Sequence, residues 1–311
     1  MRRYVFHRSL SVVITVLFVS LLVFFLMDRA EGDPMAYIYG DDVAVGIAME
    51  GHDDLPFFIR YCAFMRSFLS LKWGHNAAGR DIRELIASRF PVTLSLTLIS
   101  GTISILFSFP LAVHASVRKD SFSEKLLSAA SAIGLSLPSF LIAFMLIIVF
   151  AVTLRLFPVA GYIPLESGVF SHIRSLFLPS LTVAAVQSAL YPRMFMNALR
   201  DSLGSDYIAA SRAWGLSDGE ALFREALRPS MPVAIAMLFQ NAVSGIAGSA
   251  VVETVFALPG IGSMLVSAAL ARDSILLGIS LLLLSVISAV LFIISEILIA
   301  VADPRIGRQY A

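Results

Sequence analysis

Apolar stretches long enough to cross a membrane recur along the chain. Residues 9–27 form 19 consecutive positions without a charge, and arginines precede them. A bilayer core needs about 20 apolar residues in a helix, whereas the apolar region of a cleaved signal peptide is shorter. This stretch therefore predicts a first transmembrane helix. Five further spans are predicted at 91–116, 127–153, 176–195, 233–252 and 275–300.

The fourth predicted span is the least apolar, because Pro179, Gln187, Pro192 and Arg193 interrupt it. Proline and polar side chains are tolerated in a membrane helix where neighbouring helices or a cavity satisfy the freed polar groups. We therefore expect this span to be buried inside the helix bundle.

Residues 28–90 carry the densest charge of the chain and several turn-forming glycines and prolines. This segment is predicted to lie outside the membrane. Near its end, apolar residues recur at helical spacing beside charged ones, which predicts a short amphipathic helix leading into the second span through Ile82, Leu85, Ile86 and Phe90. The segment is interpreted either as a docking surface for a partner or as a linker with this one helix.

The distribution of lysine and arginine predicts the orientation. With the N-terminus inside, 13 of the 23 basic residues fall in inner segments, three in the two short outer segments and seven in the long first loop, where the positive-inside rule is weak. Both termini are therefore predicted to be cytoplasmic and residues 28–90 extracytoplasmic. The expected fold class is an all-α membrane protein with six transmembrane helices.

The amino-acid composition supports a membrane protein and excludes some classes of binding partner. The chain of 311 residues is 58% hydrophobic and 14% charged, against roughly 25% charged residues in soluble domains. The net charge of +1 gives no basic surface for nucleic acid. The single cysteine, Cys62, excludes an internal disulfide and a cysteine-based zinc cluster. Lipid is therefore an expected partner and nucleic acid is not.

Catalytic and metal-binding motifs are missing from the sequence. None of the three lysines follows a glycine, so the chain has no P-loop, and the five histidines are too scattered for a helical two-histidine metal motif. No G-x-S-x-G segment occurs. The chain is therefore predicted to be neither an enzyme nor a metalloprotein and to bind no cofactor itself.

One acidic residue, Glu296, lies within a predicted span, near its inner end. Intramembrane carboxylates mark polar pathways in many transporters. The alternative is a carboxylate close to the membrane interface that pairs with an arginine.

The loop between the fourth and fifth spans, residues 206–229, predicts two short helices around a turn. The first helix is expected over about 202–213, and Gly215 can adopt the positive φ that ends it. Ser217 and Glu220 then have the spacing of a capping box for the second helix. Such a loop suits either a groove on a soluble partner or an ordinary interfacial hairpin.

This loop is similar to the EAA loop of ABC importer permeases. The family pattern E-A-A-x-x-x-G aligns with Ala209, Ala210, Ser211 and Gly215, although this chain has alanine at the glutamate position and serine at the second alanine. Further motifs follow in family order over nearly the whole chain, and residues 35–68 match least. These are Met1-Arg-Arg-Tyr4, Glu31-Gly-Asp-Pro34, Gly134-Leu-Ser-Leu-Pro-Ser-Phe140, Pro158-Val-Ala-Gly-Tyr162, Asp206-Tyr-Ile, Arg212-Ala-Trp-Gly-Leu216, Val252-Glu-Thr-Val-Phe-Ala-Leu-Pro-Gly-Ile-Gly262, Ala271-Arg-Asp273 and Asp303-Pro-Arg305.

Together these motifs resemble the B-type permease subunit of dipeptide, oligopeptide and nickel importers. The resemblance implies a multi-pass subunit of the bacterial inner membrane that pairs with a homologous C-type permease. Two cytoplasmic ATPases would bind ATP and magnesium, and an extracytoplasmic solute-binding protein would deliver the solute. Contact with the ATPases would lie at Ala209, Ala210, Ser211, Arg212, Trp214, Gly215 and Leu216.

Two segments are candidates for the translocation pathway. In the fifth span, small and polar residues occupy one helical face, which favours either a pathway wall or close helix packing, at Asn241, Ser244, Gly245, Gly248 and Ser249. After this span, a carboxylate and helix-breaking residues indicate either an outer gate or a plain outer loop, at Glu253, Pro259, Gly260 and Gly262.

The predicted organisation has three parts. Residues 1–27 are the N-terminus and first span, 28–90 the extracytoplasmic segment, and 91–311 a five-helix permease core with a coupling loop at 200–230. The predicted function is that of an ATP-driven importer permease for peptides or a related small solute, and the sequence leaves open dipeptides, oligopeptides, nickel chelates and sugars. An ion-coupled secondary transporter is the alternative, although such a protein would show more intramembrane charge and an internal repeat.

Overall fold

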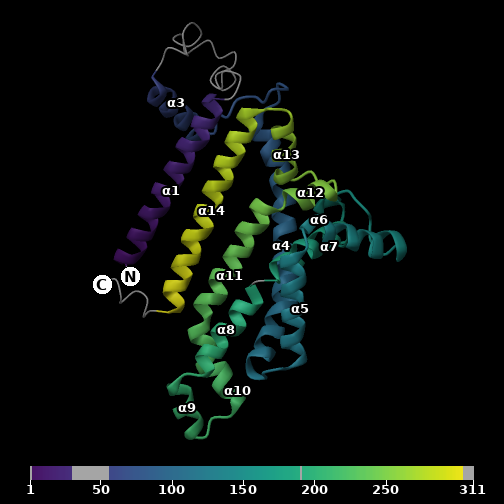
Figure 1. The fold of residues 1–311 in the computed structure, drawn as a ribbon. Helices are drawn as coiled ribbons and strands as arrows, with labels where there is room; N and C mark the ends of the chain where they lie inside the picture. The colour runs from purple at the N-terminus through teal and green to yellow at the C-terminus, as the bar shows by residue number, and fades with distance from the viewer. Residues whose placement is uncertain (1, 30–55, 190, 304–311) are drawn as a thin grey trace.

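The computed structural model describes residues 2–29, 56–189 and 191–303, and this part of the chain is mainly helical, with irregular segments such as 70–81 and 154–164 and one isolated bridge between His75 and Asp81. Its elements, shown in Figure 1, are α1 (Arg2–Arg29), α3 (Phe57–Leu69), α4 (Ile82–Val117), α5 (Phe122–Ser136), α6 (Ser139–Leu146), η2 (Ile147–Thr153), η3 (Leu165–Ser167), α7 (Val169–Gln187), α8 (Tyr191–Leu203), α9 (Asp206–Ala213), α10 (Asp218–Glu220), η4 (Ala221–Ala226), α11 (Leu227–Gly248), α12 (Ala250–Val255), α13 (Ile261–Leu270) and α14 (Ser274–Ala302). The all-α prediction is confirmed.

Among the described residues, five helices are long and apolar enough to cross a membrane, and a bent helix pair raises the number to six if it forms one span. The five are Arg8–Arg29, Ile82–Val117, Val169–Gln187, Ala221–Gly248 and Ser274–Ala302. Each overlaps a predicted span. The amphipathic helix predicted before the second span exists, but it is continuous with that span and makes α4 a single helix of 36 residues.

The third predicted span corresponds to a bent pair of helices rather than to one continuous helix. The stretch 127–153 falls in α5, α6 and η2, and the axis bends by 111° between Ser136 and Ser139. Proline disfavours the helical conformation of the residue before it, and Leu137, which precedes Pro138, is extended with φ −98° and ψ 129°. The apolar run continues through a break in the helix.

The fourth predicted span is shifted but buried as expected. Its helix, α7, ends at Gln187, and the last predicted residues, 191–195, belong to α8. In the most apolar window of α7, 44% of the residues are buried, against 28–33% in the other four helices. Pro179, Gln187 and Pro192 are therefore surrounded by protein, whereas Arg193, in α8, is exposed.

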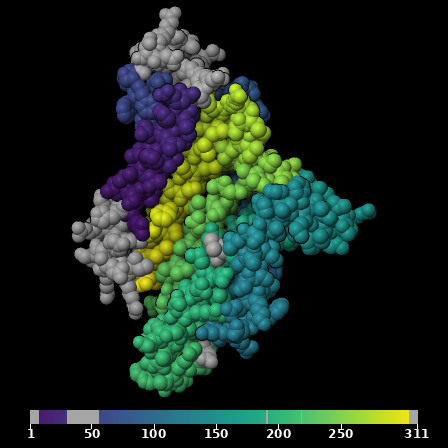
Figure 2. All heavy atoms as spheres, viewed as in Figure 1, coloured from purple at the N-terminus to yellow at the C-terminus, as the bar shows by residue number. Residues whose placement is uncertain are grey.

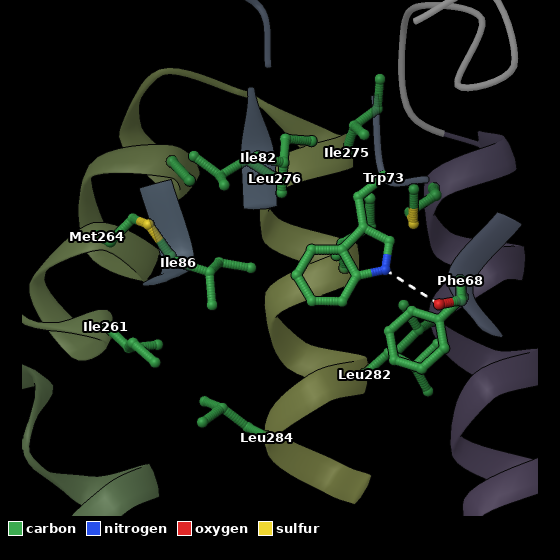
Figure 3. Close-up of a cluster of buried hydrophobic side chains, with 14 of the residues drawn as sticks. Phe68, Trp73, Ile82, Ile86, Ile261, Met264, Ile275, Leu276, Leu282 and Leu284 are labelled. Carbon is green, nitrogen blue, oxygen red and sulfur yellow. Dashed lines mark hydrogen bonds between the residues drawn. The ribbon is translucent and has the colours of Figure 1, made fainter. Parts of the chain in front are cut away.

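Residues 56–81 pack onto the bundle, which the sequence did not predict. Helix α3 lies against α1, where the Arg60 guanidinium contacts the Asp28 carboxylate at 2.6 Å and the Tyr61 and Ser20 hydroxyls are 2.6 Å apart. Figure 3 shows Trp73 inside a buried apolar cluster, where its Nε1 donates to the carbonyl oxygen of Phe68 at 3.1 Å. The segment is thus a folded cap on this end of the bundle; residues 30–55 lie outside the described residues.

Helices α1 and α14 pack side by side and in opposite directions, so α1 begins and α14 ends on the side of the molecule where α9 lies (Figure 1). Near these ends the Arg8 Nε lies 3.7 Å from Glu296 Oε2. The prediction that Glu296 pairs with an arginine is confirmed.

Candidate functional site

Residues 206–226, which we call the α9–η4 hairpin, form a protrusion at the end of the molecule opposite α3 and α13 (Figure 2). The predicted pair of short helices is present, but the first begins at Asp206 rather than at residue 202. Residues 202–203 instead complete α8. The second is the short α10, which continues as one turn of π-helix, η4, directly into α11.

Local hydrogen bonds close the end of α9. Gly215 has a φ of +99°, as predicted. Its backbone N–H donates to the Arg212 carbonyl at 2.9 Å, and that of Leu216 donates to the Ser211 carbonyl at 3.3 Å. This pair of bonds is the Schellman arrangement, which needs a left-handed residue at the glycine position. The direction in which the chain leaves α9 is therefore set by Gly215.

The predicted capping box after the turn is also present. The Glu220 N–H donates to Ser217 Oγ at 3.3 Å, and Glu220 Oε2 accepts from the Ser217 N–H at 3.1 Å and from its hydroxyl at 2.9 Å. These bonds favour the ionised carboxylate and lower the pKa of Glu220. Two adjacent local motifs thus make the bend between the helices stiff.

The inner face of the α9–η4 hairpin is anchored in a buried apolar cluster. The Ile208 side chain is fully buried, beside Leu199 of α8 and Ala221 of η4. The cluster also includes Ala112 of α4 and Leu127 of α5. The hairpin therefore rests on the ends of several long helices and cannot move independently of them.

The outer face of the hairpin carries most of the predicted coupling residues. Trp214 is 87% exposed at the tip. Two other predicted residues, Ser211 and Leu216, are half-buried, and the exposed ones are Ala209, Ala210, Arg212 and Gly215. Aromatic residues such as tryptophan are enriched in protein–protein interfaces.

A second polar site surrounds Glu253, whose side chain is fully buried in α12. Glu253 Oε1 accepts from the Thr93 and Ser249 hydroxyls, both at 2.7 Å, and Oε2 accepts from the backbone N–H of Ser263 at 2.8 Å. Thr93 Oγ1 in turn accepts from the Ile261 N–H at 2.9 Å. We call these five residues the Glu253 network; it joins α4, α12 and α13.

The interpretation of residues 253–262 as a plain loop is wrong, because Glu253, Gly260 and Gly262 are buried and Pro259 alone of the four predicted residues is exposed. A Cβ at Gly260 would lie 2.3 Å from the Glu253 carboxylate, so glycine is required for the approach. The gate interpretation stays a prediction. The backbone N–H of Gly161 also donates to the Phe256 carbonyl at 3.0 Å, so the 158–162 and 252–262 motifs meet here.

On the small-residue face of the fifth span, one glycine packs against a neighbouring helix and another is exposed. A Cβ at Gly245 would lie 2.8 Å from Thr97 Cγ2, whereas a Cβ at Gly248, which is exposed, would meet no atom within 4 Å. The Asn241 carbonyl oxygen accepts from Gln187 Nε2 at 3.0 Å, and Ser244 Oγ lies 3.4 Å from the Tyr191 hydroxyl. Gly245 therefore serves helix packing, and the pathway role of the other positions stays a prediction.

Comparison with known proteins agrees with this architecture. The model of the family described as binding-protein-dependent transport system inner membrane component matches residues 87–308, and the chain belongs to this family. The matched region contains both the α9–η4 hairpin and the Glu253 network. The family is that of ABC importer permease subunits.

Similar proteins cover the chain almost completely. It is 32% identical to the oligopeptide transport system permease protein AppB of Bacillus subtilis, over 98% of this chain and 99% of the relative. It is 30% identical to the oligopeptide transport system permease protein OppB of Haemophilus influenzae, with the same coverage. A solved structure of the MetNI methionine ABC transporter in an inward-facing conformation shares the fold, with a TM-score of 0.56, 18% identity, and coverage of 70% of this chain and 96% of the other.

Proposed function

We propose that this chain is the permease subunit of an ATP-driven importer of peptides, and that it forms half of the translocation pathway. The observation that carries the proposal is the α9–η4 hairpin, which is stiff, anchored on its inner face and open around Trp214 on its outer face. The chain is 28–32% identical to permeases named for oligopeptide or dipeptide transport. This similarity supports a peptide as the solute.

The proposed assembly contains a homologous C-type permease, two ATPase subunits and an extracytoplasmic binding protein, in the bacterial inner membrane. ATP and magnesium bind to the ATPases, and this chain is not catalytic. The α9–η4 hairpin, the start of α1 and the end of α14 face the cytoplasm, because the short segments on their side hold most of the basic residues. The folded cap of residues 56–81 then faces outward, where the binding protein docks.

Docking of an ATPase on the α9–η4 hairpin can be tested by cross-linking. With Cys62→Ser as background, Ala210→Cys carries a short maleimide–benzophenone reagent, because Ala210 is exposed beside Trp214. We expect illumination of the assembled complex to join this chain to the ATPase. Ser267→Cys, exposed on α13 at the opposite end, is the control and should give no such product. An ATPase product from Ser267→Cys alone would contradict the proposal.

We further propose that the exposed side of α11 at Gly248, with Asn241 and Ser244 on the same helix, lines the pathway. In the Cys62→Ser background, we expect Gly248→Cys in the assembled complex to react with a small water-soluble thiosulfonate about tenfold faster than Gly245→Cys, since thiol reactivity requires solvent access. Gly245 is the matched control because it packs on Thr97. Labelling of Gly248→Cys only by a lipid-soluble reagent would place this face in lipid and refute the assignment.

A further inference from the structure

One ion pair joins the base of the α9–η4 hairpin to the helices that run to the far end of the molecule. Arg200 of α8 donates from Nη1 to Glu124 Oε1 at 2.8 Å and from Nη2 to Glu124 Oε2 at 2.7 Å. Its Nη2 also donates to the Ala115 carbonyl oxygen at 2.7 Å. We call these three residues the Arg200 clasp. Bidentate arginine–carboxylate pairs combine a fixed geometry with stronger hydrogen bonds than neutral groups make.

The clasp connects several segments at once. Ala115 lies in the last turn of α4, where helix carbonyls have no partner within the helix. Glu124 lies in the first turn of α5, and its Oε2 also accepts from the backbone N–H of Asp120 in the turn between α4 and α5. Arg200 stands six residues before α9 begins at Asp206. A displacement of α9 can therefore reach α4 and α5 through this side chain as well as through the apolar cluster beside it.

The surroundings of the clasp make it a rigid connection. Arg200 and Glu124 are about one-fifth to one-quarter exposed, and the hydrogen bond to Glu124 raises the pKa of the already basic Arg200. Beside the clasp lies the buried cluster that also contains Leu127, Leu199 and Ile208. The polar pair and the apolar cluster therefore hold the same helix ends together.

Helix α4 extends this body to the other polar site. Its Thr93 belongs to the Glu253 network and its Ala115 to the Arg200 clasp. The two residues are 22 positions apart, which is about 33 Å of helix. A tilt of α4 at the clasp is directed toward Thr93, because α4 continues without a break between the two residues although Pro110 lies within it.

We propose that Arg200 and Glu124 are a positioning pair that passes the movement of the α9–η4 hairpin to α4, and through Thr93 to the Glu253 network. This inference rests on the proposed function, in which an ATPase moves the hairpin. It concerns residues outside the hairpin and assigns them a role in coupling rather than in ATPase docking.

The test reverses the charges of Arg200 and Glu124, first singly and then together, in the complete complex. The complex is reconstituted in lipid vesicles with the binding protein and its solute. We expect Arg200→Glu and Glu124→Arg each to lower solute-stimulated ATP hydrolysis by about tenfold, a usual size for coupling between sites. The double variant should recover at least about half of the wild-type stimulation, since it restores the ion pair. Lys125→Glu, an exposed charge reversal beside Glu124, is the control and should keep full stimulation.

Docking is measured in the same samples by the Ala210→Cys cross-link, which the clasp variants should keep. Full stimulation in either single variant, or no recovery in the double variant, would overturn the inference. Where a charge reversal prevents folding, Glu124→Gln keeps the shape of the side chain and should still reduce stimulation; unchanged stimulation there would also overturn it. Absence of stimulation in the wild-type complex would instead refute the proposed function itself.

Discussion

Gly260→Ala should strongly destabilise the permease, although it adds a single methyl group. The new Cβ would lie 2.3 Å from the Glu253 carboxylate carbon, so the carboxylate must leave its position. It then loses hydrogen bonds from Thr93, Ser249 and Ser263 while it remains buried. A buried carboxyl group that loses its hydrogen-bond donors costs about 1–3 kcal/mol, which should lower the melting temperature in detergent by roughly 2–12 °C.

Gly101→Ala is the matched control, because a Cβ there would meet no atom within 4 Å in the helix α4. Alanine is favoured over glycine in a helix by up to about 1 kcal/mol, so this variant should melt at or slightly above the wild-type temperature. The destabilisation of the double variant, Gly260→Ala with Glu253→Ala, should be smaller than the sum of the destabilisations of the two single variants. The reason is that Glu253→Ala removes the carboxylate with which the new Cβ at position 260 clashes. A Gly260→Ala protein that melts like the wild type would contradict the role of the Glu253 network.

Gly215→Val should uncouple solute binding from ATP hydrolysis while the protein stays folded. A Cβ at Gly215 would meet no atom within 4 Å, so the cost comes from the φ of +99° and not from a clash. A β-branched residue in that conformation costs about 1–3 kcal/mol. The turn should relax, breaking the bonds of Gly215 and Leu216 to α9 and displacing Trp214. We expect solute-stimulated ATP hydrolysis to fall by about tenfold or more.

Gly219→Val serves as the control for Gly215→Val, because Gly219 lies in the same hairpin, has no positive φ and has open space around its Cα. It should retain most of the stimulation. The melting temperatures of both variants should stay close to that of the wild type, which separates uncoupling from unfolding. Wild-type stimulation in Gly215→Val would show that the shape of this turn does not matter for coupling.

Features that depend on neighbouring residues were predictable from the sequence. The apolar runs located five helices, and the turn at Gly215 and the capping box of Ser217 and Glu220 followed from local spacing. Helix α3 also had a signal, since Phe57, Tyr61, Phe64 and Phe68 recur at helical spacing. The charges and turn residues of the surrounding segment predict a loop and therefore mask this helical spacing.

Features that depend on distant residues were not predictable. Thr93 and Glu253 are 160 positions apart, and Glu124 and Arg200 are 76 apart. In the sequence each residue is only a polar group near the end of a helix, and the packing of α4 against α12 and α13, and of α5 against α8, gives it a partner. The bend at Pro138 has a local signal in the sequence, but the apolar residues on both sides of it predict one uninterrupted span.

The central claim is that this permease works with ATPase partners, and uptake of solute into vesicles tests it most directly. Vesicles that hold the complete complex, with the binding protein on the outer face and ATP inside, should accumulate a peptide solute in the absence of any ion gradient. Hydrolysis of ATP should rise when the liganded binding protein is added, and both signals should vanish when this chain is omitted. Uptake by this chain alone, driven by a proton or sodium gradient and indifferent to ATP, would contradict the account.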